Sequence, residues 1–247
     1  MSTQEGGMYV VDSDPTSRTP GQYARAAVQR LRMRTLVWLG VLAVATAALG
    51  RGFGLHDARF IAAELVLLAS MFVISRYVLP LVERRDRGAR GEEHVGELLD
   101  GLAEESWRVI HDASLGHGNV DHIAIGPAGI FTVETKSHPG PVHVRRMHGA
   151  IIAQAQAQAK AMARVTGLEV QPLVVFSRAW VDRPMARRKG VRVVPARMLL
   201  GFLAKQPTTL TRGQVESAHE QVARALQEHQ AKERAARERW RPLRSQL

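Results

Sequence analysis

The sequence predicts an α/β domain that follows two membrane-spanning helices. The helices are indicated by two apolar segments, because residues 35–50 carry no charge and a second apolar segment runs from Phe60 to Val82. The domain is indicated from Gly88 onward, where segments with the helical period of 3.6 residues alternate with short apolar segments typical of strands. A chain of 247 residues can hold one ordinary domain and these additional segments.

The first element is predicted to be a disordered cytoplasmic tail over residues 1–30, which are rich in Gly, Ser, Thr, Asp and Pro. Residues 31–82 are predicted to form a transmembrane hairpin. A span needs roughly 20 apolar residues to cross about 30 Å of hydrocarbon, so the first span has to extend back to Leu31 while Arg32 and Arg34 snorkel to the interface. The second apolar segment is long enough by itself.

Arginine residues flank the hairpin unevenly. The ends that adjoin the tail and the domain carry eight of them: Arg25, Arg30, Arg32, Arg34, Arg84, Arg85, Arg87 and Arg90. The connection between the spans carries only Arg51 and Arg59. Because positive charge stays on the cytoplasmic side, we expect a multi-pass protein of the cell (inner) membrane with both termini and the domain in the cytoplasm.

Two other interpretations of the apolar segments stay open. They are also compatible with a buried helical hairpin of a soluble protein. A cleaved signal peptide is less favoured, because its positive region would exceed thirty residues and would contain Asp12 and Asp14. Even then the second segment would stop transfer and leave the domain inside.

The domain itself is predicted over residues 83–205, with a C-terminal helix and basic tail over 206–247. In order, we expect a helix over 91–104, a strand over 107–112, a hairpin over 119–136, a helix over 149–165, and strands over 171–176 and 191–194. The last helix begins at Thr211, which stands at capping-box spacing from Gln214, and Leu210 and Val215 have the spacing of a hydrophobic staple.

The hairpin segment contains the first candidate site. Its turn is predicted at residues 126–129, Gly-Pro-Ala-Gly, since Pro pre-sets φ and Gly tolerates positive φ. If these four residues are the whole turn, Asp121 lies directly opposite Glu134, where like charges repel. A divalent cation between the two carboxylates would convert this repulsion into ligation, because Mg²⁺ takes carboxylate oxygens and water.

Lys136 belongs to the same candidate site. It is two residues after Glu134, so both side chains leave one face of the strand, while Phe131 and Val133 point to the opposite, buried face. Beside a metal ion, Lys136 would orient or deprotonate a water molecule or balance charge on a phosphate. The alternative is an ordinary surface ion pair, which contributes under about 1 kcal/mol.

Two helices supply further candidates. In the first, Glu92 flanks a buried stripe and Glu93 points to solvent; the stripe consists of Val95, Leu98, Leu99 and Leu102. In the second, Gln154 and Gln158 lie along the edge of a stripe made of Ile151, Ala155, Ala159 and Met162. A glutamine in such a place often only satisfies backbone groups.

Composition limits the chemistry. The chain has a formal net charge of +11 and no cysteine, which excludes thiol nucleophiles, cysteine-bound zinc and iron–sulfur clusters. Its excess of Arg and Ala is typical of a GC-rich bacterial genome. The positive balance suits an anionic partner, either nucleic acid or an anionic membrane surface. Four histidines near the hairpin could assist metal or phosphate binding, but they match no zinc motif: His122, His138, His143 and His148.

Five motifs in this order resemble the nuclease-related domain (NERD) family of the PD-(D/E)xK restriction-endonuclease-like superfamily. They are Gly88-x-x-Gly91-Glu92, Gly118-Asn119-Val120-Asp121-His122, Gly126-Pro127-x-Gly129-Ile130-Phe131-x-Val133-Glu134-x-Lys136, Gln154-Ala155, and Pro172-Leu173-Val174-Val175-Phe176. The resemblance covers residues 87–176. It implies a restriction-endonuclease-like mixed sheet flanked by helices.

The resemblance also implies an active-site set of Glu92, Asp121, Glu134, Lys136 and Gln154. Asp121, Glu134 and the carbonyl of Thr135 would hold Mg²⁺ or Mn²⁺. The chain departs from the family pattern at Thr135, where an apolar or small residue is usual. It also departs in the Ala/Gln repeat around Gln154, which leaves Gln158 as a rival.

The function expected from these residues is metal-dependent hydrolysis of phosphodiester bonds, with DNA as the preferred substrate class. Asp121 and Glu134 would bind the metal, Glu92 would complete the shell directly or through water, and Lys136 would act on the attacking water. The alternatives are a non-catalytic module that holds nucleic acid at the membrane and a membrane scaffold for a protein partner. A pure binder would gain nothing from carboxylates beside phosphates.

Overall fold

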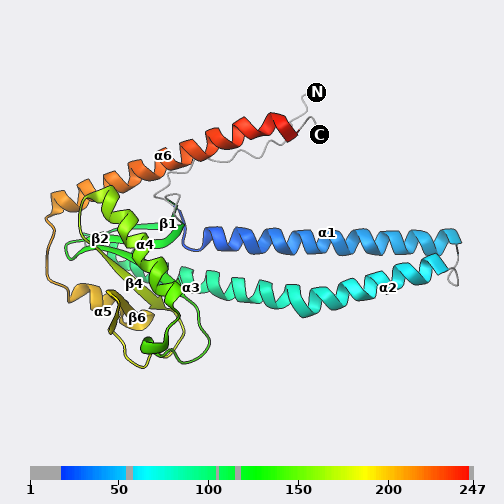
Figure 1. Cartoon of the computed structure of the whole chain (residues 1–247), viewed down its shortest axis with the longest axis horizontal. Coiled ribbons are helices and arrows are strands. Elements are labelled where there is room, and N and C mark those ends of the chain that lie inside the picture. The colour runs from blue at the N-terminus through cyan, green and yellow to red at the C-terminus, as the bar shows by residue number, and fades with distance from the viewer. Residues whose placement is uncertain (1–17, 54–57, 104–105, 115–117, 245–247) are drawn as a thin grey trace.

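The computed structural model of the protein describes residues 18–53, 58–103, 106–114 and 118–244. A long helical hairpin projects from one side of an α/β domain, and the last helix runs back over the domain in the same general direction (Figure 1). Most of the tail predicted over residues 1–30 lies outside the described residues, as does the Gly116-His117 part of the loop before Asn119.

The hairpin consists of α1 (Gln22–Phe53) and a second rod made of α2 (Ala58–Val73), the π-helical turn η1 (Ile74–Val78) and α3 (Leu79–Ala103). The second rod bends where the π turn precedes Pro80, the local features that usually kink helices. The two arms pack closely at Gly50, where an added Cβ would lie 2.9 Å from the ring of Phe60.

The apolar side chains of the helical hairpin are exposed. Trp38 and Phe72 are 55% and 67% exposed, and the most apolar window of each arm is only 6% buried. A buried helical hairpin of a soluble protein would cover these side chains. The chain therefore has two helices that are long and apolar enough to cross a membrane.

The start of α1 corrects one expectation. Residues 22–30 were predicted to belong to the disordered tail, but they form the first turns of α1. Val28 is 4% exposed against α3, and Arg25 forms an ion pair with Glu93. Glu93 therefore does not point to open solvent as the helical pattern predicted; its side chain is 16% exposed because α1 covers it.

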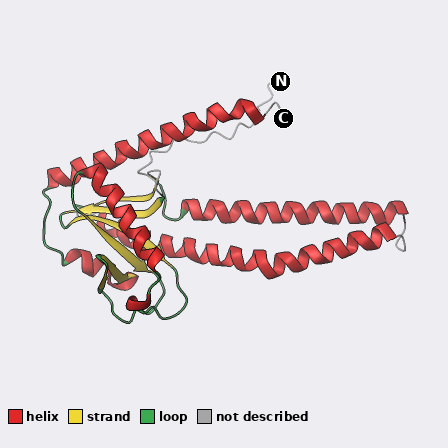
Figure 2. Ribbon diagram, viewed as in Figure 1, coloured by secondary structure: helices red, strands yellow, loops and turns green. Residues whose placement is uncertain are grey.

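The domain is built on a six-stranded mixed sheet (Figure 2). Its strands are β1 (Arg108–Ser114), β2 (Asn119–Gly126), β3 (Gly129–Lys136), β4 (Val170–Phe176), β5 (Arg187–Arg188) and β6 (Val191–Pro195). They lie in the order β1-β2-β3-β4-β6-β5. The first three strands are antiparallel neighbours, β3, β4 and β6 run parallel, and β5 returns antiparallel to β6. The predicted mixed sheet flanked by helices is thus confirmed.

Helices cover both faces of the sheet. On one face, α3 and α5 (Leu199–Ala204) enclose a core around Leu99, Phe131 and Phe202. On the other face, α4 (Gly149–Thr166) and α6 (Arg212–Arg244) enclose a core around Met162 and Leu226, and α4 also covers a second core around Ile152 and Val174. Burial on both faces explains why the strands read as nearly continuous apolar runs.

The ends of the helices follow local sequence signals. The predicted capping box of α6 is present, since the amide of Gln214 donates to the Thr211 hydroxyl at 3.3 Å and the Thr211 amide donates to the Gln214 side chain at 2.8 Å. Helix α4 ends at Gly167, which has φ +66, as a C-terminal glycine commonly does. The short elements β5 and α5 were not predicted, because neither is long enough to show a period.

Candidate active site

The β2–β3 hairpin adopts the predicted register. Gly126 pairs with Gly129 around a two-residue loop, and the ladder continues to His122 opposite Val133. The next position brings Asp121 to the level of Glu134. At this point the backbone pairing of the two strands ends, and the amide of Thr135 instead donates a hydrogen bond to Asp121 Oδ2 at 2.7 Å.

Glu134 is the central carboxylate of the site. It is only 2% exposed, because α4 covers the face of β3 that the sequence suggested would be open. Lys136 forms an ion pair with Glu134 Oε1, and Gln158 Nε2 donates to Glu134 Oε2 at 2.5 Å. The ion pair and the amide bond satisfy both oxygens of this buried carboxylate and fix its orientation.

Asp121 carries less compensation than Glu134. Burial, and then the negative charges of Glu134 and Glu92, raise its pKa well above the usual value, while the bond from the Thr135 amide and the charge of Lys136 lower it. Carboxylates are therefore concentrated around Asp121 on the β2–β3 hairpin. A cation bound there would relieve the repulsion that the sequence predicted.

Helix α3 brings Glu92 to the same place, next to the stripe that the helical pattern predicted to be buried. The pKa of Glu92 is raised from 4.5 to about 7, first by burial and then by the negative charges of Asp112 and Glu134, while the charge of Lys136 lowers it. Glu92, Asp112, Asn119 and Asp121 all line one pocket of about 360 Å³. The pocket is therefore strongly acidic.

Asp112 is a site residue that sequence reasoning missed. It lies on β1, is 2% exposed, and has φ +50, which interrupts the pairing of β1 with β2 between His111 and Ala113. Asn119 Nδ2 donates to Asp112 Oδ1 at 3.2 Å. The signal that could have found it is a carboxylate in a predicted strand close to Val109 and Ile110, since a buried acid is rare without a specific role.

The glutamine at the site is Gln158. It is 5% exposed and bonds to Glu134 and, at 2.8 Å, to the carbonyl of Asn119, whereas Gln154 is exposed one turn earlier. At 100° per residue, Gln158 lies about 60° from the buried Ala155 around the helix and Gln154 about 100°. The two positions are close enough in angle that the sequence pattern alone could not separate them.

The four histidines singled out in the sequence have structural contacts. His122 points to the face opposite Asp121, where its Nδ1 lies 2.8 Å from Nδ1 of His111, and burial lowers its pKa from 6.5 to about 3. His138 hydrogen-bonds its own loop at Gly140. His143 bonds to Asp182, and His148 caps α4 by accepting from the amide of Ala150 at 3.2 Å.

The donor set suits a hard divalent ion rather than zinc. Within the described ranges, no group of three or more His, Asp or Glu side chains is arranged as a metal-binding group. The predicted ligands are two carboxylates, Asp121 and Glu134, and the carbonyl of Thr135, and Mg²⁺ commonly binds through one or two carboxylates with water. Carboxylates of this kind are compatible with a hard divalent ion, whose charge would offset the crowded negative charge around Asp121.

The comparison with known families matches this region of the chain. Residues 87–177 match the nuclease-related domain. This segment runs from α3 through β4 and includes the acidic cluster of Glu92, Asp112, Asp121 and Glu134. These residues form a NERD domain. An uncharacterized protein of Bacillus anthracis is 32% identical over 85 residues, which cover 32% of this chain and 40% of that protein. The chain thus spans less than half of the length of that relative.

Two solved structures are similar to parts of the chain. A repair endonuclease from Pyrococcus abyssi matches 49% of this chain and 47% of its own chain, with 17% identity and a TM-score of 0.28. SfsA from Pyrococcus furiosus, in complex with Ca²⁺, matches 56% and 53% of the two chains, with 19% identity and a TM-score of 0.23.

The start of α1 forms one wall of the NERD pocket. Ala24 and Ala27 line it beside Arg85 and Gly88 of α3. The preceding segment is held by Arg18, which donates to the carbonyl of Asp112 at 2.8 Å. The hairpin and the NERD domain therefore share a surface at the acidic cluster.

Proposed function

We propose that the protein is a membrane-anchored nuclease that hydrolyses phosphodiester bonds with the help of Mg²⁺ or Mn²⁺, with DNA as its preferred substrate class. The observation that carries this proposal is the buried Glu134 carboxylate, held between Lys136 and Gln158 beside a second carboxylate, Asp121. A protein that only bound nucleic acid would gain nothing from burying these negative charges where phosphates must approach.

In the proposed site, Asp121, Glu134 and the carbonyl of Thr135 would hold the ion. When bound, the ion supplies an acidified water and a positive charge next to the scissile phosphate. Gln158 keeps the Glu134 carboxylate oriented, and it takes the place of Gln154 in the active-site set that the family resemblance implied. The Gln158 Oε1 atom is buried and has no hydrogen-bond partner among the described residues, so it is available to accept a bond from a water.

Lys136 and Glu92 handle the remaining charge. The Lys136 side chain is 31% exposed, so its ammonium reaches the open side of the site and is suited to orient the attacking water or contact the phosphate. Glu92 has a pKa of about 7 and therefore exchanges a proton readily near neutral pH. It would complete the ligand shell of the ion, directly or through water.

The membrane anchor is part of the proposal. The exposed apolar arms of the hairpin support two spans, and the excess of arginine at the domain end supports an orientation with both termini and the NERD domain in the cytoplasm. Because α1 packs against α3 beside the pocket, the experiments below use the full chain in detergent rather than an isolated domain.

The test is a cleavage assay with plasmid, linear and single-stranded DNA and with RNA, in Mg²⁺ or Mn²⁺. We compare the wild type with Glu134→Gln, Lys136→Met and the control Lys160→Met, which changes an exposed lysine of α4. EDTA should stop cleavage, and each site variant should lower the rate by about a hundredfold or more while the control keeps it.

A thermal melt of each variant shows whether the fold survives, because removing one partner of a buried ion pair can destabilise a protein by about 3–5 kcal/mol. Binding without metal-dependent cleavage of any of these substrates would contradict the nuclease and favour a non-catalytic module. Neither binding nor cleavage would favour a membrane scaffold.

A further inference from the structure

Two loops meet beside Lys136 and form an ordered surface. They are residues 137–148, which follow β3, and residues 177–190, which follow β4 and include β5. The amide of Ser177 donates to the carbonyl of Lys136 at 3.1 Å, so the second loop begins at the candidate catalytic lysine. Ser137 and Ser177 both pack against Gly91, next to Glu92.

The loops are joined to each other by several hydrogen bonds. Val142 and Val181 form a parallel bridge, and the amide of Val142 donates to the carbonyl of Trp180 at 2.7 Å. The amide of Val144 donates to Asp182 at 3.0 Å, and Arg188 donates to the carbonyl of Val144 at 3.0 Å. The side chains on this surface are therefore presented by a fixed backbone.

The surface is strongly basic. The two loops contain seven arginine or lysine residues and a single carboxylate, Asp182, which is engaged by His143 and by the amide of Val144. Six of the basic side chains are exposed: Arg145, Arg146, Arg178, Arg183, Arg187 and Lys189. We call this set, together with Trp180, the basic loop surface. Its charge fits a polyanion.

Trp180 adds an aromatic face to this charge. Its side chain is 56% exposed, whereas Ala179 and Val181 on either side are 4% and 2% exposed. Because an extended segment turns alternate side chains to opposite sides, burial of the two neighbours forces Trp180 outward. A large aromatic ring held in water beside several arginines is the arrangement that stacks on unpaired bases.

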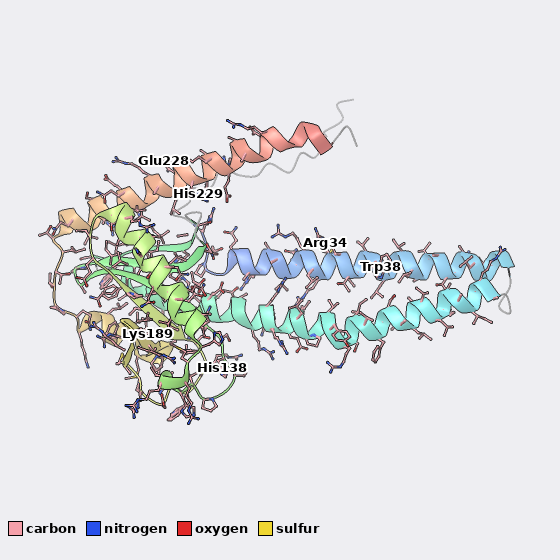
Figure 3. All side chains as sticks on the ribbon, viewed as in Figure 1. Arg34, Trp38, His138, Lys189, Glu228 and His229 are labelled. Atoms are coloured by element: carbon pink, nitrogen blue, oxygen red, sulfur yellow. The ribbon has the colours of Figure 1, made fainter. Side chains whose placement is uncertain are left out.

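The direction of the surface distinguishes nucleic acid from lipid. Figure 3 shows His138 and Lys189 on the lower side of the domain, while the apolar arm that carries Trp38 projects sideways, far from both. A bilayer that surrounds Trp38 therefore does not lie over these loops. Exposure to solvent next to the acidic pocket suits a long, soluble polyanion.

We infer that the basic loop surface binds the nucleic acid strand that enters the site and that Trp180 stacks on an unpaired base, so the preferred substrates contain a single-stranded segment. This inference rests on the proposed nuclease function for its meaning, but binding can be measured without cleavage. The arginines bind the phosphates of single-stranded and of paired nucleic acid alike, whereas stacking on Trp180 favours substrates with unpaired bases.

The experiment is fluorescence anisotropy of labelled 20-nucleotide oligothymidine and of a 20-base-pair duplex, with the full chain in neutral detergent and EDTA. Arg145→Ala/Arg146→Ala should weaken binding of both oligonucleotides and lower the slope of log affinity against log salt by roughly 0.7–0.9 for each phosphate that the variant no longer neutralises. The matched control is Arg197→Ala/Lys205→Ala, which removes two exposed positive charges at the two ends of the α5 region, on the face of the sheet that α3 and α5 cover.

For the aromatic residue, Trp180→Ala should weaken oligothymidine binding by roughly fivefold to a hundredfold and leave duplex binding nearly unchanged, while Trp180→Phe should retain most of the affinity. An unchanged affinity in Arg145→Ala/Arg146→Ala, an equal reduction in the control pair, or an equal effect of Trp180→Ala on both oligonucleotides would overturn the inference. If the protein binds through this surface but does not cleave in Mg²⁺ or Mn²⁺, only the proposed nuclease function is contradicted. If the protein cleaves and the substitutions at Arg145, Arg146 and Trp180 change neither binding nor cleavage, only the proposed role of the basic loop surface is contradicted.

Discussion

Replacing Glu92 by glutamine should stabilise the protein at alkaline pH. The Glu92 side chain lies close to Asp112 and Glu134 in a partly buried pocket, and its pKa rises from 4.5 to about 7 in the folded protein. Because the folded state binds this proton more tightly than the unfolded state does, protonation favours folding. The resulting stability is complete below about pH 4.5 and is lost as the pH rises through about 7.

The size of the effect follows from the same shift. A pKa that rises from 4.5 to about 7 corresponds to roughly 3 kcal/mol for a fully coupled group. The Glu92 carboxyl keeps some contact with water, so we expect about 1–2 kcal/mol at pH 8. Glu92→Gln, which resembles the protonated acid, should therefore melt about 2–8 °C above the wild type at pH 8 and close to it at pH 4.5.

The assay is thermal unfolding of the full chain in detergent and EDTA from pH 4.5 to 8. Glu97→Gln is the control, because Glu97 is exposed on the same helix and the substitution removes the same charge. The reasoning is refuted if Glu92→Gln at pH 8 is no more stable than Glu97→Gln, or if its advantage over the wild type does not shrink as the pH falls.

The remaining predictions concern the metal, the glutamine and the membrane. Added Mg²⁺ or Mn²⁺ should raise the melting temperature of the wild type by ligand linkage, and an equal rise in Asp121→Asn would speak against a metal at this carboxylate. Gln158→Leu should lower cleavage at least about tenfold, while Gln154→Leu should not; the opposite order would return the catalytic role to Gln154. Reporter fusions at the C-terminus should be cytoplasmic and tags inserted at residues 54–57 should be external, and an external C-terminus would contradict the orientation.

Local features of the fold were predictable from sequence because neighbouring residues determine them. The Gly-Pro-Ala-Gly turn sets the register of the β2–β3 hairpin, and that register alone brings Asp121 to the level of Glu134. The capping residues of α6 act within one turn, so the start of that helix was also recognisable. In both cases the residues that determine the structure lie within a few positions of the feature that they determine.

Contacts between distant segments were not predictable in this way. Gln158 reaches Glu134 and Gln154 does not, because the packing of α4 on the sheet fixes the rotation and the position of the helix. The two residues differ by about 40° around its axis and by about 6 Å along it. The helical start of α1 depends on α3, which lies more than 60 residues away in the sequence. Asp112 joins the site through the backbone conformation of a strand, which composition does not reveal.

The second arm of the hairpin continues without a break into the helix that carries Glu92. At a rise of 1.5 Å per residue, Glu92 lies only about 15 Å beyond Val82, the end of the second predicted span. With the hairpin in a bilayer, the NERD domain would have a fixed height and no freedom to swing outward. Its site would then lie within about two Debye lengths of the headgroups at physiological salt. Nucleic acid would have to approach a negatively charged lipid surface to be cut, and part of the large positive charge of the chain would serve to offset that repulsion.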